Sequence, residues 1–199
     1  MLVLGIDQSV NTSTAVELHM NKNGKFEIKK EDSYKGKSTG VYRLYEIDLW
    51  LNRIVNAAKP DLLVREMHMM RQYGNAGAVS GVNAMIDLLA YRCGYVEDET
   101  YIRISPGTWK KFIFGKGNLK KDTAYLVHFN RYLGRSTYLS VPPQYQVTDD
   151  NVADAIGLAV TGYVAYCIKK DRPAGITSPE VRNHLKQNTD AMFDYGKKE

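Results

Sequence analysis

The sequence is short of the residues that build metal-thiolate sites, disulfides and membrane spans. Cysteine occurs only twice, as Cys93 and Cys167, far apart and outside any Cys-x-x-Cys pattern. Two such cysteines indicate buried free thiols in a reducing cytoplasm and argue against a zinc site or a required disulfide. No apolar run approaches the length of a membrane span, and Asp7 interrupts the apolar N-terminus too early for a signal peptide. We therefore expect a cytoplasmic protein with no membrane partner.

A nucleotide phosphate loop is also missing. The stretch Gly36-Lys-Ser-Thr39 resembles the end of such a loop, but Glu31 stands where the leading glycine should be. An actin-like ATPase also begins with a Gly-x-Asp strand, but it would need a second phosphate loop and a larger chain. The sequence therefore argues against an ATPase.

The composition is that of one globular domain, and its positive charge is concentrated in one stretch. The chain has 199 residues, of which 44% are hydrophobic and 25% charged, and its net charge is +5. Residues 101–140 hold eight basic residues and one acid, so this stretch carries +7 and the remainder −2. Such a stretch favours a polyanionic partner, most commonly nucleic acid, although a solvated basic face is the alternative.

Hydrophobic periodicity predicts an α/β fold over residues 1–170, followed by a polar tail over 171–199. Asn23-Gly24 predicts a hairpin between the second and third strands. The predicted strands cover 2–6, 12–20, 25–32, 61–66 and 101–104, and the predicted helices cover 39–58, 75–93, a start at 106, 120–132 and a last one from about 150 to 169.

Acidic residues fall where the predicted elements would bring them together. Asp7 and Glu66 each end a buried strand, and Asp150 and Asp154 lie four residues apart on one helical face. Each acid also has a simpler interpretation. Asp7 could cap the following turn, Asp149 or Asp150 could complement a helix dipole, and Glu66 could be a salt-bridge partner.

Converging carboxylates repel one another unless cations balance them. Oxygen ligands without a neighbouring Cys or His favour Mg²⁺, with Mn²⁺ as a substitute. Two such ions about 4 Å apart suit in-line attack of water on a phosphodiester. The pattern therefore predicts a metal-dependent site that acts on nucleic acid.

Four motifs occur in order along roughly the first 170 residues. They are Gly-Ile-Asp7-x-Ser9, the strand-end Glu66, Pro106-x-x-Trp109-Lys110-Lys with Gly115-x-Gly117 and Lys121, and Asn151-x-Ala-Asp154-Ala-Ile-x-Leu-Ala. The ordered set resembles the RuvC-type Holliday-junction resolvases of the RNase H-like superfamily, with the phage-encoded branch as the nearer likeness. The resemblance implies a mixed five-stranded sheet flanked by helices.

The resemblance also implies an activity and the residues that carry it. It implies a magnesium-dependent crossover junction endodeoxyribonuclease, active on branched DNA as a homodimer through the helix 75–93, which core burial alone could also explain. The implied metal ligands are Asp7, Glu66, Asp154 and, as the fourth, Asp150, with Asn151 and Asp149 as rivals. Lys110 and Lys121 match basic residues near the scissile phosphate. The further expected DNA contacts are Lys111, Lys116, Lys120, Met69 and Tyr73.

Two other functions remain open at this point. The same fold with an impaired site could bind junctions without cutting them, a possibility that the Asp150/Asn151 ambiguity supports. A YqgF-like nuclease that processes RNA is the other alternative.

Overall fold

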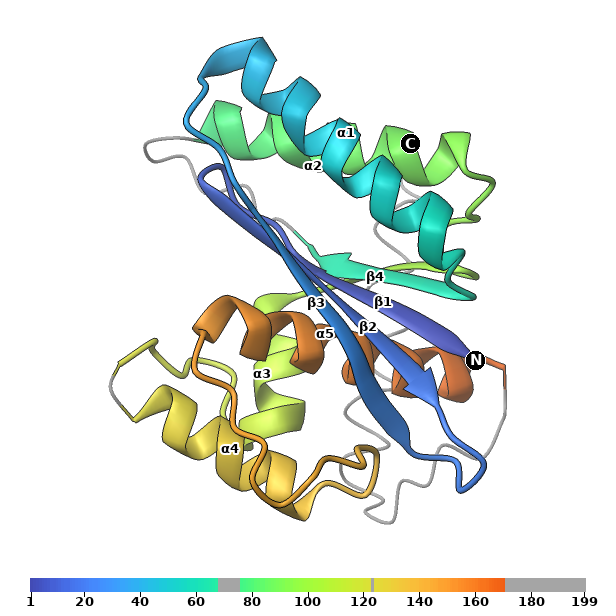
Figure 1. Cartoon of the computed structure of the whole chain (residues 1–199), viewed down its shortest axis with the longest axis vertical. Helices are drawn as coiled ribbons and strands as arrows, with labels where there is room; N and C mark the ends of the chain where they lie inside the picture. Colours follow the sequence, from blue (N-terminus) through green and yellow to red (C-terminus); the bar gives the residue numbers. More distant parts are fainter. Residues whose placement is uncertain (68–75, 123, 171–199) are drawn as a thin grey trace.

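The computed structural model describes residues 1–67, 76–122 and 124–170, which form a five-stranded sheet between two helical layers (Figure 1). The strand order is β3-β2-β1-β4-β5. β1 is antiparallel to β2 and parallel to β4, and β4 is parallel to β5. The strands are β1 (Leu2–Asp7), β2 (Thr12–Met20), β3 (Phe26–Lys35), β4 (Leu62–Glu66) and β5 (Tyr101–Ile104). The mixed sheet predicted from the sequence is confirmed.

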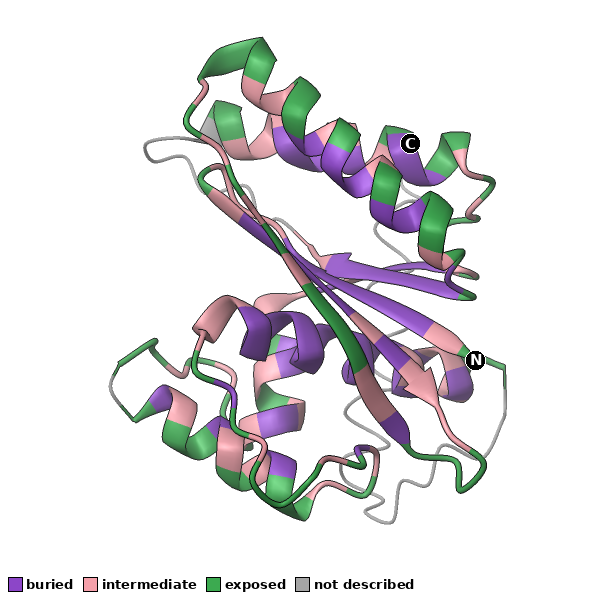
Figure 2. Ribbon diagram, in the orientation of Figure 1, coloured by how far each residue is buried: buried purple, intermediate pink, exposed green. Residues whose placement is uncertain are grey.

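The two helical layers cover opposite faces of the sheet (Figure 1). Helices α1 (Gly40–Ala58) and α2 (Ala76–Arg92) pack on the face that carries Leu4, Ile6 and Leu63. Helices α3 (Pro106–Phe114), α4 (Tyr125–Arg135) and α5 (Asp150–Lys169) cover the other face. The central strands and α5 are buried almost throughout, whereas α1 exposes its outer side (Figure 2).

Helix α5 lies in direct contact with β1 because Gly5 has no side chain. A Cβ at Gly5 would come within 2.1 Å of the Ala155 carbonyl oxygen. At the far end of the helix, a Cβ at Gly162 would come within 2.4 Å of the Val64 side chain. These two contacts fix the helix against β1 and β4, the two strands that end in the predicted acids.

The composition of α5 corrects one expectation from the sequence. Within the described residues, α5 is the one helix long and apolar enough to cross a membrane by length and composition, and 78% of that segment is buried inside the fold. The sequence analysis found no run of this kind because polar and small residues interrupt it. Here the apolar surface of α5 packs against the sheet.

Helix α4 begins later than the sequence predicts, at Tyr125 instead of residue 120. The Asp122 carboxylate accepts a hydrogen bond from the Ala124 amide at 3.0 Å, and the Asp122 carbonyl accepts one from Tyr125. An aspartate that bonds the backbone two residues on favours a turn over a helix. Lys121 therefore stands on a loop in front of α4.

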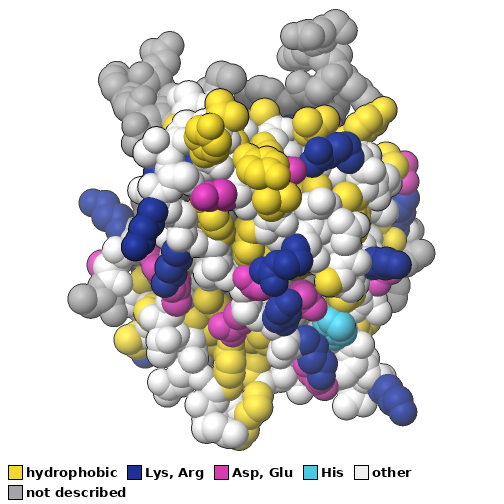
Figure 3. Space-filling view, turned by 45° about the horizontal axis from the view of Figure 1, so that its top comes forward, with side chains coloured by type: hydrophobic (Ala, Val, Ile, Leu, Met, Phe, Trp, Pro, Cys, Tyr) yellow, Lys and Arg dark blue, Asp and Glu magenta, His cyan; other side chains and the backbone are white. Residues whose placement is uncertain are grey.

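The outer edge of the sheet carries alternating charges. On β3, Lys29 pairs with Glu27 at 2.5 Å, and Asp32 pairs with Arg53 of α1 at 3.1 Å. Figure 3 shows such acidic and basic side chains interleaved across the middle of the molecule. Charges on an edge strand oppose pairing with another strand. This edge is therefore protected against pairing with a further strand.

Candidate active site

Two carboxylates meet at one end of the sheet because β1 and β4 are adjacent and parallel. Ile6 pairs with Arg65 in the register of these strands, so the next residues, Asp7 and Glu66, stand side by side. Side chains alternate along a strand, and both acids therefore face the α5 layer, as Val3 and Val64 do. Asp7 is only 6% exposed.

Neither carboxylate has a hydrogen bond or ion pair within residues 1–67, 76–122 and 124–170. Asp7 does not cap the turn that follows β1, because the hydroxyl groups of Ser9 and Ser13 hold that turn. Ser9 Oγ donates to the Thr12 carbonyl at 2.6 Å, and Ser13 Oγ donates to the Ser9 carbonyl at 3.0 Å. The simpler interpretations of Asp7 and Glu66 therefore find no support in the described structure.

Asp154 is the third acid at this end of the sheet, on the first turns of α5, and it is 3% exposed. The contact of Ala155 with Gly5 brings its neighbour Asp154 to the end of β1. The Tyr125 hydroxyl donates a hydrogen bond to Asp154 Oδ1, and Lys121 Nζ lies 2.8 Å from Oδ2. Asp154 thus has partners where Asp7 and Glu66 have none.

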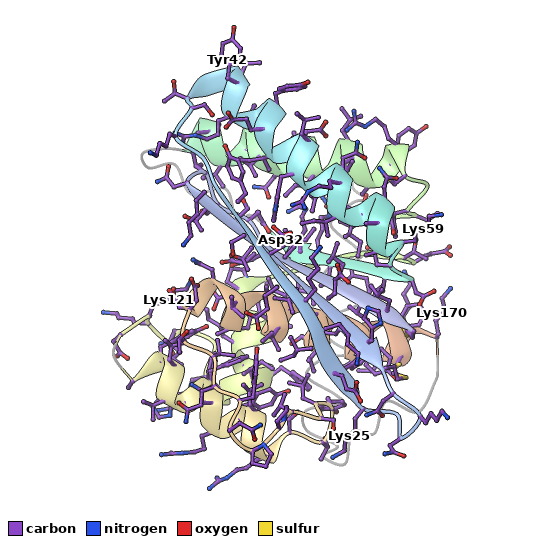
Figure 4. All side chains as sticks on the ribbon, in the orientation of Figure 1. Lys25, Asp32, Tyr42, Lys59, Lys121 and Lys170 are labelled. Atoms are coloured by element: carbon purple, nitrogen blue, oxygen red, sulfur yellow. The ribbon has the colours of Figure 1, made fainter. Side chains whose placement is uncertain are left out.

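Lys121 contacts two of the three residues that the sequence predicts as candidates for the fourth metal ligand. Its Nζ lies 3.2 Å from Asp150 Oδ2 and 3.5 Å from Asn151 Oδ1. Asp149 has a different role, because it is the N-cap of α5 and accepts from the Asn151 amide at 2.8 Å. The structure therefore brings Asp150 and Asn151 to Lys121 and assigns Asp149 to the helix start. Lys121 lies beside the first turn of α5 (Figure 4).

Burial raises the pKa of all three acids, and the charge of Asp154 adds to the effect on Asp7 and Glu66. Burial, and then the charge of Asp154, raise the pKa of Asp7 well above its ordinary value and that of Glu66 to about 7. Burial also raises the pKa of Asp154, against the opposing charge of Lys121. Burial acts to lower the pKa of Lys121, but Asp154, Asp7 and Asp150 together leave it raised. Binding of a further cation would lower these raised pKa values and keep all the carboxylates ionised.

The donor chemistry of this group fits a hard divalent cation, since it offers carboxylate oxygens and no thiol or imidazole. The carboxylates of this group do not lie close enough together in this structure to bind one ion jointly. In the part of the chain that the structure describes, no three Asp, Glu, His or Cys residues are grouped closely enough to hold one ion. The Lys121 ammonium lies against Asp154 and Asp150 and supplies positive charge to these two carboxylates.

The remaining predicted site residues lie around this group. Lys110 is on α3, 5.4 Å from the centre of the Trp109 ring, and its charge acts on both Glu66 and Asp154. Lys111 is on the same helix, and Lys116 and Lys120 are exposed on the loop between α3 and α4. The predicted DNA contacts Met69 and Tyr73 lie outside the described residues, as does the predicted tail.

Two further residues that the sequence did not single out hold the acids in place. Tyr125 lies within the helix predicted over 120–132, and its hydroxyl contacts Asp154. Arg65 was read as part of a strand, yet its guanidinium donates to the Glu66 carbonyl at 2.7 Å and to Asn83 at 2.9 Å. An arginine in a buried strand, directly before the strand-end acid, was the available signal.

Comparison with solved structures places this fold with RuvC. One structure of Thermus thermophilus RuvC shares 18% identity over 86% of this chain and 97% of its own, with a TM-score of 0.64. A second, T. thermophilus RuvC in complex with a Holliday junction substrate, shares 16% identity over 82% of this chain and 94% of its own, with a TM-score of 0.63. No family model and no curated protein matches the sequence. The RuvC-type fold is confirmed, and the phage-encoded branch stays a prediction.

Proposed function

We propose that this chain is a divalent-metal-dependent endonuclease that resolves four-way DNA junctions. The observation that carries the proposal is a pair of carboxylates, the buried Asp7 and the half-buried Glu66, which lack partners in the described ranges and stand at adjacent strand ends near Asp154. The basic stretch 101–140 and the shared fold with a RuvC seen in complex with a Holliday junction substrate support DNA as the partner.

In this proposal, Asp7, Glu66 and Asp154 hold Mg²⁺ or Mn²⁺, with Asp150 as the fourth acid. The chemistry that a divalent ion supplies at such a site is polarisation of a phosphoryl oxygen and activation of water. Lys121 balances the acids in the metal-free protein, and its flexible ammonium can turn from Asp154 towards a phosphate. Lys110 adds positive charge from α3, where it favours the negative charge that develops during cleavage.

Cleavage of a synthetic four-way junction tests this proposal. The wild type should cut it with Mg²⁺ and not with EDTA, and Asp7→Asn should lose at least about 100-fold in rate. The matched control is Asp61→Asn, an exposed acid just before β4, at the end of that strand away from Glu66. Undiminished cutting by Asp7→Asn would refute the metal assignment. Faster cutting of RNA than of the junction would select the RNA-processing alternative.

A second candidate function is junction binding without cleavage. Two observations favour it: Asp150 is 42% exposed and tied to Lys121, and no three potential ligands in the described residues are grouped for one ion. Junction binding at nanomolar protein with no hydrolysis at any Mg²⁺ or Mn²⁺ concentration would select this candidate. Manganese density between Asp7, Glu66 and Asp154 in a soaked crystal would count against it.

We also propose that the active form is a homodimer, joined through the outer face of the α1–α2 layer. Hydrophobic side chains gather on this face (Figure 3), and Tyr42 points away from the molecule (Figure 4). Its exposed apolar residues are Val41, Tyr42, Tyr45 and Leu49 on α1 and Leu88 and Tyr91 on α2. Exposed apolar patches of this kind mark interaction surfaces. A two-fold enzyme would present two sites to the two equivalent strands of a junction.

Light scattering tests the dimer. The wild type should have the mass of two chains, and Tyr45→Glu combined with Tyr91→Glu should give one chain with an unchanged fold by circular dichroism. Lys25→Glu combined with Lys170→Glu alters exposed residues that lie away from the α1–α2 layer (Figure 4) and should leave the mass unchanged. A monomeric wild type at micromolar concentration would reject the dimer and leave the metal site untouched.

A further inference from the structure

A basic pocket lies between α3 and α4, separate from the group of acids. It has a volume of about 310 Å³, with Phe114 and Tyr132 among the residues that line it. Four of its lining residues are basic: Lys116, His128, Arg131 and Arg135. Lys116 is one of the DNA contacts expected from the sequence, whereas His128, Arg131 and Arg135 are outside the predicted site residues.

The cationic side chains of this pocket make no ion pair with an acid of the described residues. Within residues 1–67, 76–122 and 124–170, neither Arg131 nor Arg135 makes an ion pair or a side-chain hydrogen bond, and both are exposed. Other exposed arginines of the described chain do have acids beside them, such as Arg53 with Asp32 at 3.1 Å and Arg92 with Asp48 at 2.5 Å. The pocket therefore carries positive charge that no ion pair within the described residues balances.

The three basic residues of α4 form a row that leads away from the active site. Successive residues turn by about 100° around a helix, so His128, Arg131 and Arg135 share a face about 60° wide. The rise of about 1.5 Å per residue places them about 5, 9 and 15 Å along the axis from Tyr125, which contacts Asp154. Phosphates of one DNA strand recur about every 3.4 Å along a duplex, so Arg135 lies about four nucleotide steps from Tyr125.

We propose that the α3–α4 pocket is an anchor for the phosphate backbone of a DNA arm, within about four nucleotides of the scissile bond. Arg131 and Arg135 hold the phosphates, and Lys116 extends the anchor towards the loop that carries Lys121. Exposed guanidinium groups suit phosphate oxygens because they offer paired donors. This inference rests on the proposed function, since it takes DNA as the ligand, but it does not depend on metal binding or cleavage.

The salt dependence of binding tests the anchor in the metal-free protein. The affinity for a fluorescent four-way junction is measured in EDTA between 50 and 200 mM salt, for the full-length wild type and Arg131→Ala/Arg135→Ala. Each lost phosphate contact lowers the slope of log affinity against log salt by about 0.9, so two contacts lower it by about 2. The same relation gives a loss in affinity on the order of 50-fold at 0.1 M salt.

The matched control is Lys22→Ala/Lys25→Ala, which removes the same charge from the β2–β3 hairpin and should leave the slope within about 0.5 of the wild type. If the arginine variant and the control lose equal slope, the charge acts only through the general field and the anchor is refuted. If the wild type binds the junction and the arginine variant keeps its slope, the anchor alone fails. If the wild type does not bind the junction even at 50 mM salt, the proposed function fails with it.

Discussion

Arg65 and Glu66 are neighbours on β4, and they show two opposite ways of placing a charge inside a protein. Arg65 is 2% exposed and faces α2, where every side of its guanidinium meets a partner. It donates to Asp87 at 2.6 Å, to Asn83 at 2.9 Å and to the Glu66 carbonyl at 2.7 Å, and it also contacts the Tyr101 hydroxyl. The partners of Arg65 are complete within the chain.

Glu66 faces the other side of the sheet, and its carboxylate has no partner in the described residues. Its backbone is nevertheless held on both sides, because its amide donates to Gln8 Oε1 at 3.2 Å and its carbonyl accepts from Gln8 and Arg65. The Arg65 network thus fixes the strand that presents the unpaired acid. The comparison shows one charged group whose partners lie within the described chain and another whose burial no partner there offsets.

Removal of Arg65 should have the largest effect. Arg65→Met removes one of the two donors, Arg65 and Gln8, to the Glu66 carbonyl and to Asn83 Oδ1. It also leaves Asp87 without its ion pair at 2.6 Å. We expect the free energy of unfolding to fall by about 3 kcal/mol. Urea denaturation checks this, with the exposed Arg53→Met as the matched control, for which less than about 1 kcal/mol is expected. Equal losses in the two variants would show that the Arg65 network is no stronger than a surface pair.

The Glu66 side chain should behave in the opposite way. Its pKa of about 7 in the fold lies above the ordinary value of 4.5, so the folded state holds the proton more tightly. Stability contributed by this group is therefore present below pH 4.5 and is lost as the pH rises towards 7 and beyond. At pH 8 in EDTA, Glu66→Gln should raise the free energy of unfolding by up to about 3 kcal/mol.

A thermal melt in EDTA and in Mn²⁺ checks the Glu66 prediction. Mn²⁺ should stabilise the wild type and have little effect on Glu66→Gln, because the variant lacks one ligand. Glu99→Gln, an exposed glutamate 3.7 Å from Lys170, is the matched control and should change neither melt. A variant less stable than the wild type in EDTA at pH 8 would contradict the view that this carboxylate is unfavourable.

The contrast between Arg65 and Glu66 explains what the sequence could and could not predict. Asp7 and Glu66 come together because side chains alternate along a strand and because β1 and β4 pair in parallel. Both features follow from the apolar runs and the order of the elements in the sequence. The elements were therefore predicted with correct types. The start of α4 was wrong because the Asp122 turn competes with the helix locally.

Contacts between distant elements could not be predicted in the same way. Tyr125 reaches Asp154 and Arg65 reaches Asp87 only once α4, α5 and α2 are packed on the sheet. Periodicity reports which side of an element is buried, but it does not report which polar atom faces it across the interface. The assignment of Asp149 as the helix cap likewise depended on the backbone at the start of α5.

Lys121 is the one cation that contacts the acids in the described structure. Its removal should therefore make the group of acids differ further from the fully paired Arg65. Lys121→Met takes the ammonium from Asp154 at 2.8 Å and from Asp150 at 3.2 Å. Because this lysine side chain is 36% exposed, we expect a loss of only about 1 to 2 kcal/mol in EDTA at pH 8. Mn²⁺ should then stabilise the variant more than the wild type, since no ammonium competes with it. A smaller stabilisation by Mn²⁺ would show that Lys121 assists metal binding.

Tyr125 provides the smallest and most specific test. Through its hydrogen bond, Asp154 has a partner within the chain, as Arg65 does. Tyr125→Phe keeps the ring, which packs 5.0 Å from the Phe114 ring, and removes only the hydroxyl that donates to Asp154 Oδ1. We expect a loss of about 1 kcal/mol in EDTA, the ordinary worth of one hydrogen bond. Tyr132→Phe is the matched control, since the buried Tyr132 hydroxyl lies beside Ser136 and contacts none of the acids. If Tyr125 only fills space, the two variants will melt together with and without Mn²⁺. If it orients the Asp154 carboxylate, Tyr125→Phe alone will need more Mn²⁺ to reach half of its stabilisation.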